Sequence, residues 1–246
     1  MSISLHPAGH ILGSAQILIE SDKGRLIYTG DFRTKQARTV ENYQSIKCDT
    51  LIMETTFGRP HYKFPPRENV EMDLLQLVTD KLAAGLIPVI FAYPLGKAQE
   101  ILHLISNSGI KIAADYSILR LAYIYKKYGV SFGEYEKFRR SEFRDKVLLM
   151  PVSFRHQRFI KNIPNKYTIF MSGWGMDASA KFRLQVDRVM PYSDHADFDE
   201  LVQIAVDSDA SEIYCTHGFD DFVTMLRNLG LNAHPLVSKP QMDLFE

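Results

Sequence analysis

Four side chains with metal-binding chemistry stand at the ends of predicted strands or in a loop beside them: His10, Asp31, His195 and His217. Imidazole and carboxylate groups together are ligands that borderline metals such as zinc accept in proteins. In open α/β sheets, functional groups gather at the carboxyl ends of strands, and Glu54 also stands at such an end. Taken singly, each residue has an ordinary alternative, such as a turn-forming Asp or a loop histidine. Taken together, they predict a His/Asp metal cluster, and no particular reaction follows from that pattern alone.

A second histidine pair has a spacing that metal sites on helices use. His6 and His10 are four residues apart, so a helix would present both imidazoles to one zinc ion. Pro7 and Gly9 lie between them and disfavour a helix. We therefore expect His10 to lie in a glycine-containing loop between strands.

The segment around His195 lies between a predicted strand and a predicted helix. Asp197 and Glu200 have the spacing of a capping box, which opens a helix. Helix capping explains Asp197, and it is also the structural explanation for Asp194. Capping does not explain His195, which stays a candidate for chemistry.

The elements that must position these groups alternate along the chain. The first 55 residues read as short apolar strands, and strands then alternate with helices, which is typical of a mostly parallel sheet. Predicted strands are 16–20, 25–29, 50–54, 87–93, 111–114, 147–152, 167–171, 184–190, 212–216 and 233–237. Predicted helices are 67–85, 96–106, 115–127, 198–206 and 219–229. The pattern predicts an α/β protein throughout.

Composition excludes several classes of protein. Of 246 residues, 46% are hydrophobic and 24% are charged, which excludes a disordered chain, a collagen and a coiled coil. No apolar run is long enough to span a membrane, and the first residues do not read as a signal peptide. The two cysteines, Cys48 and Cys215, cannot build a disulfide framework or a zinc knuckle, and they fit a reducing cytoplasm.

The net charge of zero conceals two opposed blocks. Residues 126–166 hold eleven Lys or Arg against four Asp or Glu, whereas residues 187–221 hold ten acidic residues and one Arg. One reading is a surface for a polyanion and another surface for cations. The alternative is two ordinary solvated faces, and charge alone does not decide between them.

Six motifs in order make the chain recognisable. It resembles the β-CASP nucleases of the metallo-β-lactamase fold, and most closely the ligase-associated DNA exonucleases, which are also described as messenger-RNA 3′-end processing factors. The motifs are HPAGHILGSA at 6–15, YTGD at 28–31, ETTFG at 54–58, LGKAQE at 95–100, SDHAD at 193–197 and THG at 216–218.

The resemblance implies a two-domain α/β fold. Residues 1–58 and 182–246 would form an αββα metallo-β-lactamase sandwich that is incomplete at its N-terminus. Residues 59–181 would form the inserted β-CASP α/β domain, a lid over a nucleic-acid cleft. The diagnostic His-x-His-x-Asp-His motif is absent. We therefore expect the sequence to begin inside the first domain, through a start placed too far downstream, a split gene or a degenerate copy.

The resemblance also implies roles for single residues in a two-zinc centre. His10 would bind one zinc ion and His217 the other, with Asp31 bridging them. His195 would contact the scissile phosphate or protonate the leaving oxygen, and Glu54 would orient His195. The expected substrate-binding residues are Ser193, Lys97, Arg155, Arg158 and Lys161.

Two functions follow from the resemblance. The first is a zinc-dependent, exonuclease-like phosphodiesterase acting on single-stranded DNA or RNA, in DNA repair or messenger-RNA processing. The second is a noncatalytic nucleic-acid-binding or scaffold homologue, because the metal ligands are incomplete. Hydrolysis of small thioesters or lactams is disfavoured by the insertion. Expected partners are a DNA ligase, a separately encoded N-terminal half or a second copy of the chain, in the cytoplasm and away from membranes.

Overall fold

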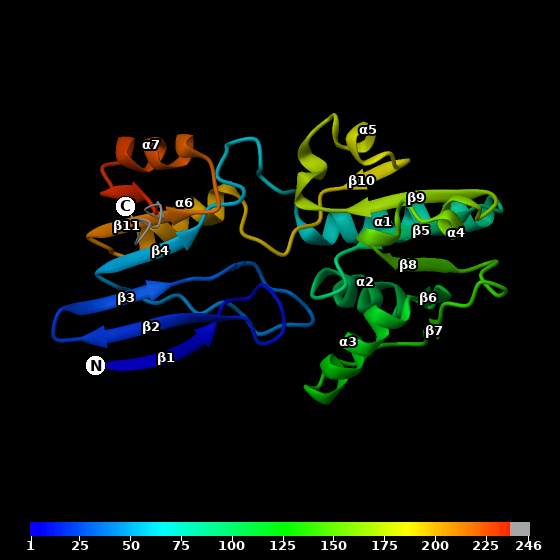
Figure 1. The fold of residues 1–246 in the computed structure, drawn as a ribbon, viewed down its shortest axis with the longest axis horizontal. Coiled ribbons are helices and arrows are strands. Elements are labelled where there is room, and N and C mark those ends of the chain that lie inside the picture. The colour runs from blue at the N-terminus through cyan, green and yellow to red at the C-terminus, as the bar shows by residue number, and fades with distance from the viewer. Residues whose placement is uncertain (237–246) are drawn as a thin grey trace, which may run out of the picture.

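The computed structural model describes residues 1–236, which form two six-stranded sheets lying side by side (Figure 1). The first, the mixed sheet, has the order β1-β2-β3-β4-β11-β12. Strands β1, β2 and β3 pair antiparallel, and the remaining neighbours pair parallel. Their bounds are β1 (Ser2–Pro7), β2 (Ala15–Ser21), β3 (Gly24–Tyr28), β4 (Thr50–Glu54), β11 (Glu212–Thr216) and β12 (Ala233–Pro235).

Two helices cover one face of the mixed sheet. Helix α6 (Phe198–Asp207) and helix α7 (Asp220–Asn228) pack their apolar stripes onto alternate residues of the central strands. The predicted capping box opens α6: Asp197 accepts from the Glu200 amide and Glu200 accepts from the Asp197 amide, each at 3.0 Å. The core on this face includes Leu18, Ile27, Leu51, Ile213, Leu201 and Phe222.

The opposite face of the mixed sheet carries a row of apolar side chains, which we call the outer face. Strand register aligns Leu5, Ile17, Tyr28, Ile52 and Tyr214 across five strands. Within residues 1–236, none of the five belongs to a hydrophobic core cluster, and Leu5 is 68% exposed. Strand β1 also forms an edge of the sheet. This face and edge therefore offer apolar area and unpaired backbone groups.

The second sheet, the parallel sheet, has the order β10-β9-β5-β8-β6-β7, and all its neighbours pair parallel. Its strands are β5 (Ile87–Ala92), β6 (Ile112–Ala114), β7 (Glu136–Lys137), β8 (Val147–Pro151), β9 (Lys166–Met171) and β10 (Arg188–Met190). The central strands β5 and β8 are buried throughout, which explains their continuous apolar runs.

Helices cover both faces of the parallel sheet. One face packs against α1 (Arg67–Ala83), α2 (Lys97–Ser106) and α3 (Tyr116–Lys127). The other face packs against α4 (Arg158–Lys161), α5 (Ala180–Leu184) and the 3-10 turn η1 (Val152–Phe154). A second 3-10 turn, η2 (Gly173–Met176), follows β9. Among the described helices, none has the length and apolar character needed to cross a membrane.

An ion-pair cluster lies where the two sheets meet. The Arg67 guanidinium contacts Glu71 Oε1 at 3.2 Å and Glu100 Oε2 at 2.8 Å, and all three side chains are buried. Arg38, from the loop that follows β3, reaches Glu71 at 2.6 Å, and the Thr39 amide donates to Glu100 at 2.9 Å. These contacts tie a loop of the mixed sheet to helices α1 and α2 of the parallel sheet.

Most predicted elements are confirmed, and one is wrong in part. The predicted strand at 184–190 is wrong in its first half, because α5 ends at Gln185 in a left-handed conformation (φ 53°) and only Arg188–Met190 is strand. Strand β1 was not predicted, and its presence confirms that His6 is not helical. Val237, the last residue of the predicted strand at 233–237, lies outside the described residues. The two-domain division stays a prediction, although β10 pairs with β9 in the parallel sheet.

Candidate metal centre

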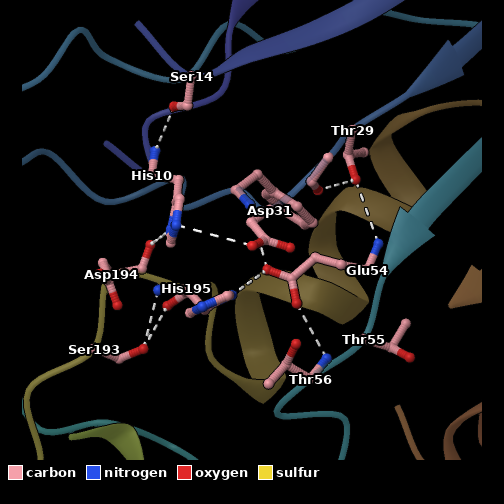
Figure 2. A network of polar contacts seen from close by, with 12 residues as sticks. His10, Ser14, Thr29, Asp31, Glu54, Thr55, Thr56, Ser193, Asp194 and His195 are labelled. Carbon is pink, nitrogen blue, oxygen red and sulfur yellow. Dashed lines mark hydrogen bonds and ion pairs between the residues drawn. The ribbon is translucent and has the colours of Figure 1, made fainter. Parts of the chain in front are cut away.

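Three of the four residues of the predicted His/Asp cluster come together, two predicted ligands and the predicted acid His195. His10, Asp31 and His195 each offer a donor atom, and these atoms lie within 4.8 Å of one another (Figure 2). His10 Nε2 lies 3.9 Å from Asp31 Oδ2, and the rings of His10 and His195 are 4.6 Å apart between centroids. The three residues follow β1, β3 and β10 along the chain. Segments far apart in sequence therefore converge on one donor set, which we call the triad.

The loop after β1 fixes His10. Gly9 has a φ of +75°, and a side chain there would collide with the backbone carbonyl of Arg33. The Ser14 hydroxyl accepts from the His10 amide at 3.1 Å. The His10 ring donates from Nδ1 to the backbone carbonyl of Asp194 at 2.9 Å. The Nε2 lone pair is therefore free on the side that faces Asp31.

Glu54 and His195 form a buried pair. His195 Nδ1 donates to Glu54 Oε1 at 2.8 Å, and the Thr56 amide donates to Glu54 Oε2 at 3.1 Å (Figure 2). Burial opposes both charges, but the hydrogen bond and the opposite charge prevail. They lower the pKa of Glu54 and raise the pKa of His195. The pair thus favours a carboxylate and an imidazolium with its remaining N–H at Nε2.

Lys97 and Ser193 border the triad. Lys97 Nζ lies 2.7 Å from Asp194 Oδ1, and both side chains are largely buried. Although burial opposes ionisation, the Lys97 charge holds the pKa of Asp194 well below its usual range. The Ser193 hydroxyl accepts from the His195 amide at 3.0 Å, which helps to fix the backbone at His195. Lys97 is therefore already paired with a carboxylate.

His217 does not belong to the triad. It follows β11 in a left-handed conformation (φ 56°) and its side chain is exposed. Its neighbour Thr216 is aligned with Glu54 in the sheet, so His217 emerges at the same sheet edge as the triad. Its assignment to a second metal ion stays a prediction.

A cavity of about 350 Å³ adjoins the triad, and its lining includes His10, Lys97, Ser193 and His195. Sequence reasoning missed two of its aromatic walls, Tyr93 and Trp174. Each follows a strand of the parallel sheet, β5 and β9 respectively. Tyr93 and Trp174 could therefore have been found in the sequence by their positions just beyond the ends of two strands.

The predicted basic residues lie in other pockets. Arg155 and Lys161 line one pocket with Lys166 and Lys181, against the face of the parallel sheet that α4 and α5 cover. Arg158 lines a separate pocket. Neither pocket shares a lining residue with the cavity beside the triad. The basic stretch and the triad are thus distinct surfaces.

Comparison with known proteins identifies the family, although no protein-family model matches the chain. The chain is 37% identical over 244 residues to the "Probable DNA ligase" of Opitutus terrae, a match that covers 98% of the chain and 24% of that protein. It is 33% identical over 137 residues to the "RNase J-like protein" of Methanocaldococcus jannaschii, covering 52% of the chain and 32% of that protein. It is 33% identical over 131 residues to the "Uncharacterized protein in lig 3'region" of Acidianus ambivalens, covering 52% of the chain and 89% of that protein.

The chain belongs to the β-CASP group of the metallo-β-lactamase family. This membership confirms the resemblance that the six motifs predicted. The chain spans 24% and 32% of the lengths of the first two relatives above. At the level of the family it is thus related to ribonucleases.

Proposed function

We propose that this chain carries part of the centre of a metal-dependent nuclease, which hydrolyses phosphodiester bonds of single-stranded DNA or RNA. The observation that supports this proposal is the triad together with the buried Glu54–His195 pair. His10 and Asp31 supply an imidazole and a carboxylate of the kind that ligate zinc, and the His195 imidazole completes a set of three donors only when it is neutral. Zinc is the metal that the β-CASP resemblance implies. The triad supplies donors for one ion and not for two.

The protein groups at the site have separable tasks. His10 is held by the Asp194 carbonyl, so its Nε2 is oriented as a ligand before any ion arrives. The role of His195 depends on its protonation state. When it is neutral, Nε2 can bind a metal ion, and when it is protonated, Nε2 can donate a proton. The Glu54 carboxylate favours the protonated form, which supports His195 as the acid that protonates the leaving oxygen. Zinc, when bound, would lower the pKa of water and stabilise charge on phosphate oxygens.

Zinc binding and cleavage test this proposal together. We expect the chain to bind fewer than two zinc ions, and to lose that zinc on His10→Ala substitution. The exposed His156, remote from the triad, provides the control variant His156→Ala. Cleavage of 5′-labelled single-stranded DNA and RNA should be abolished by a chelator and by Asp31→Asn. Equal zinc content in the two histidine variants, or cleavage that survives the chelator, would contradict the proposal.

A noncatalytic nucleic-acid-binding homologue is the second candidate. It is supported by the basic pocket of Arg155, Lys161, Lys166 and Lys181, which is separate from the triad. Phosphate contacts bind without sequence preference and weaken with salt. Under this candidate, the chain binds single strands without cleaving them, and Arg155→Ala with Lys161→Ala flattens the salt dependence of the affinity. Fluorescence anisotropy with labelled oligonucleotides measures both quantities.

The relatives also support proposals on fold and partners. We infer that the mixed sheet is one half of an αββα sandwich, because helices cover one face and the outer face is apolar. Residues 1–58 and 182–246 would belong to that domain and residues 59–181 to the β-CASP insertion. The match of 98% of the chain to a probable DNA ligase supports action beside a ligase at DNA ends. Faster cleavage of DNA than of RNA would support this partner, and the reverse order would contradict it.

A further inference from the structure

Aromatic rings lead from the triad into the adjoining cavity. The Phe57 ring meets the His195 ring edge-on at 6.1 Å between centroids, and the Trp174 ring lies 4.9 Å from Phe57. Tyr62 meets Trp174 edge-on at 5.3 Å. Phe57 itself is buried, so it serves as a support for its neighbours. The cavity therefore has a firmly packed aromatic wall that begins at the triad.

The wall depends on a residue without a side chain. A Cβ at Gly173 would overlap the Phe57 ring, so glycine lets Phe57 lie directly against the turn that carries Trp174. The Ser172 hydroxyl accepts from the Trp174 amide at 3.3 Å and fixes the start of this turn. The Trp174 ring therefore packs against Phe57, and a hydrogen bond from its backbone amide to Ser172 fixes its backbone.

A second aromatic side chain borders the same cavity. Tyr93 follows β5 and Trp174 follows β9, and the register of these neighbouring strands brings their carboxyl ends to one edge. Tyr93 is 49% exposed and Trp174 is half-buried. Both rings line the cavity, and a partly open aromatic surface of this kind is available to a planar ligand.

The charges in the cavity favour a base over a phosphate. Lys97 is the only Lys or Arg in the described lining, and its ammonium is paired with Asp194 at 2.7 Å. The remaining polar groups include the hydroxyls of Ser172 and Ser193. A volume of about 350 Å³ lies in the range of small-molecule pockets. The cavity thus offers apolar area with a few hydroxyls and little uncompensated positive charge.

We propose that this cavity is a nucleobase-stacking subsite, in which Trp174 and Tyr93 hold the base of the nucleotide next to the phosphate at the triad. This inference rests on the proposed function, because it takes its substrate class from it. Every base has a π face, so such a subsite tolerates any sequence but requires an unpaired base. It would select single strands or frayed ends over intact duplex.

Trp174 is the only tryptophan of the chain, so its fluorescence reports on the subsite directly. The experiment titrates zinc-free protein with an oligothymidylate and with an abasic oligonucleotide of equal length. Both carry a 5′ label, so anisotropy measures binding while Trp174 emission measures stacking. We expect the thymidylate to bind and to quench Trp174, and the abasic strand to bind more weakly without quenching.

Variants of the second aromatic side chain extend the test. Tyr93→Ala keeps the Trp174 reporter and should weaken thymidylate binding about fivefold or more, since one stacked base contributes roughly that factor. The abasic strand should bind Tyr93→Ala and the parent equally. Tyr123→Ala, on the exposed side of α3, is the matched control and should change neither quantity.

The outcomes separate the inference from the proposed function. If thymidylate binds while Trp174 emission is unchanged and Tyr93→Ala binds like the parent, the subsite does not exist, although nucleic-acid binding stands. If neither oligonucleotide binds at any salt concentration, the proposed function itself fails, and the subsite with it. Quenching by both oligonucleotides alike would also overturn base stacking, because the abasic strand has no base to stack.

Discussion

Replacing Arg67 by Met should strongly destabilise the chain. Arg67 is 11% exposed and contacts two carboxylates, those of Glu71 and Glu100, which are 4% and 5% exposed. Removing one partner of a buried ion pair typically costs about 3–5 kcal/mol, because it leaves a charge buried without compensation. Arg38 still contacts Glu71 in the variant, so we expect about 3 kcal/mol. That is a large fraction of the roughly 5–15 kcal/mol by which native proteins are stable.

Urea unfolding followed by Trp174 fluorescence measures this loss. Lys47→Met is the control, because Lys47 pairs with Asp209 on the surface, where solvent screens the charges and an ion pair contributes little to stability. Adding Glu100→Gln to Arg67→Met should restore part of the stability, since the double variant no longer buries that unpaired charge. If Arg67→Met unfolds at the same urea concentration as Lys47→Met, the cluster does not stabilise the junction of the two sheets.

Three further outcomes are expected. The parent chain should self-associate through the outer face and the β1 edge, and Ile3→Lys with Leu5→Lys should reduce this in analytical ultracentrifugation; a monomeric parent would contradict it. In chelated protein, the Glu54–His195 pair should stabilise the fold most between about pH 4.5 and 6.5. The stabilisation from the raised pKa of His195 is lost as pH rises through that raised pKa. The stabilisation from the lowered pKa of Glu54 is lost as pH falls through that lowered pKa. Thermal melts of Glu54→Gln against the parent should therefore differ most in that window, and a pH-independent difference would refute the pairing. Cleavage by the parent, if restored with zinc, should be at least tenfold slower in Glu54→Gln, measured with labelled single strands.

Local signals predicted the elements that obey local rules. Strands β4 and β11 have the predicted bounds because each is a short apolar run between polar residues. Helix α6 begins where its capping box predicts. The stretch after α5 misled the prediction, because alternating Leu184 and Val186 suit a strand while a left-handed residue between them ends a helix. Strand β1 has few apolar residues, so only its pairing with β2 defines it.

The candidate site was predictable in its residue types and not in its geometry. The positions of Asp31 and His195 after predicted strands, and of His10 in a glycine-containing loop, are visible in the sequence, so their chemistry could be inferred. Their mutual distances depend on how the two sheets meet, which no local pattern encodes. The aromatic wall was missed for the same reason, since Phe57 and Trp174 come from distant segments and become neighbours only in the fold.

Asp194 contacts both the triad and the parallel sheet's helix α2, so it couples metal binding to the arrangement of the two sheets. Its carbonyl fixes the His10 ring, while its carboxylate holds Lys97 at the first residue of α2. Any change in the angle between the sheets must therefore move an imidazole of the triad or break one of these contacts. Linkage is reciprocal, so a ligand that immobilises His10 resists that change in angle by the same free energy. Occupancy of the triad and the angle between the two sheets are therefore thermodynamically coupled.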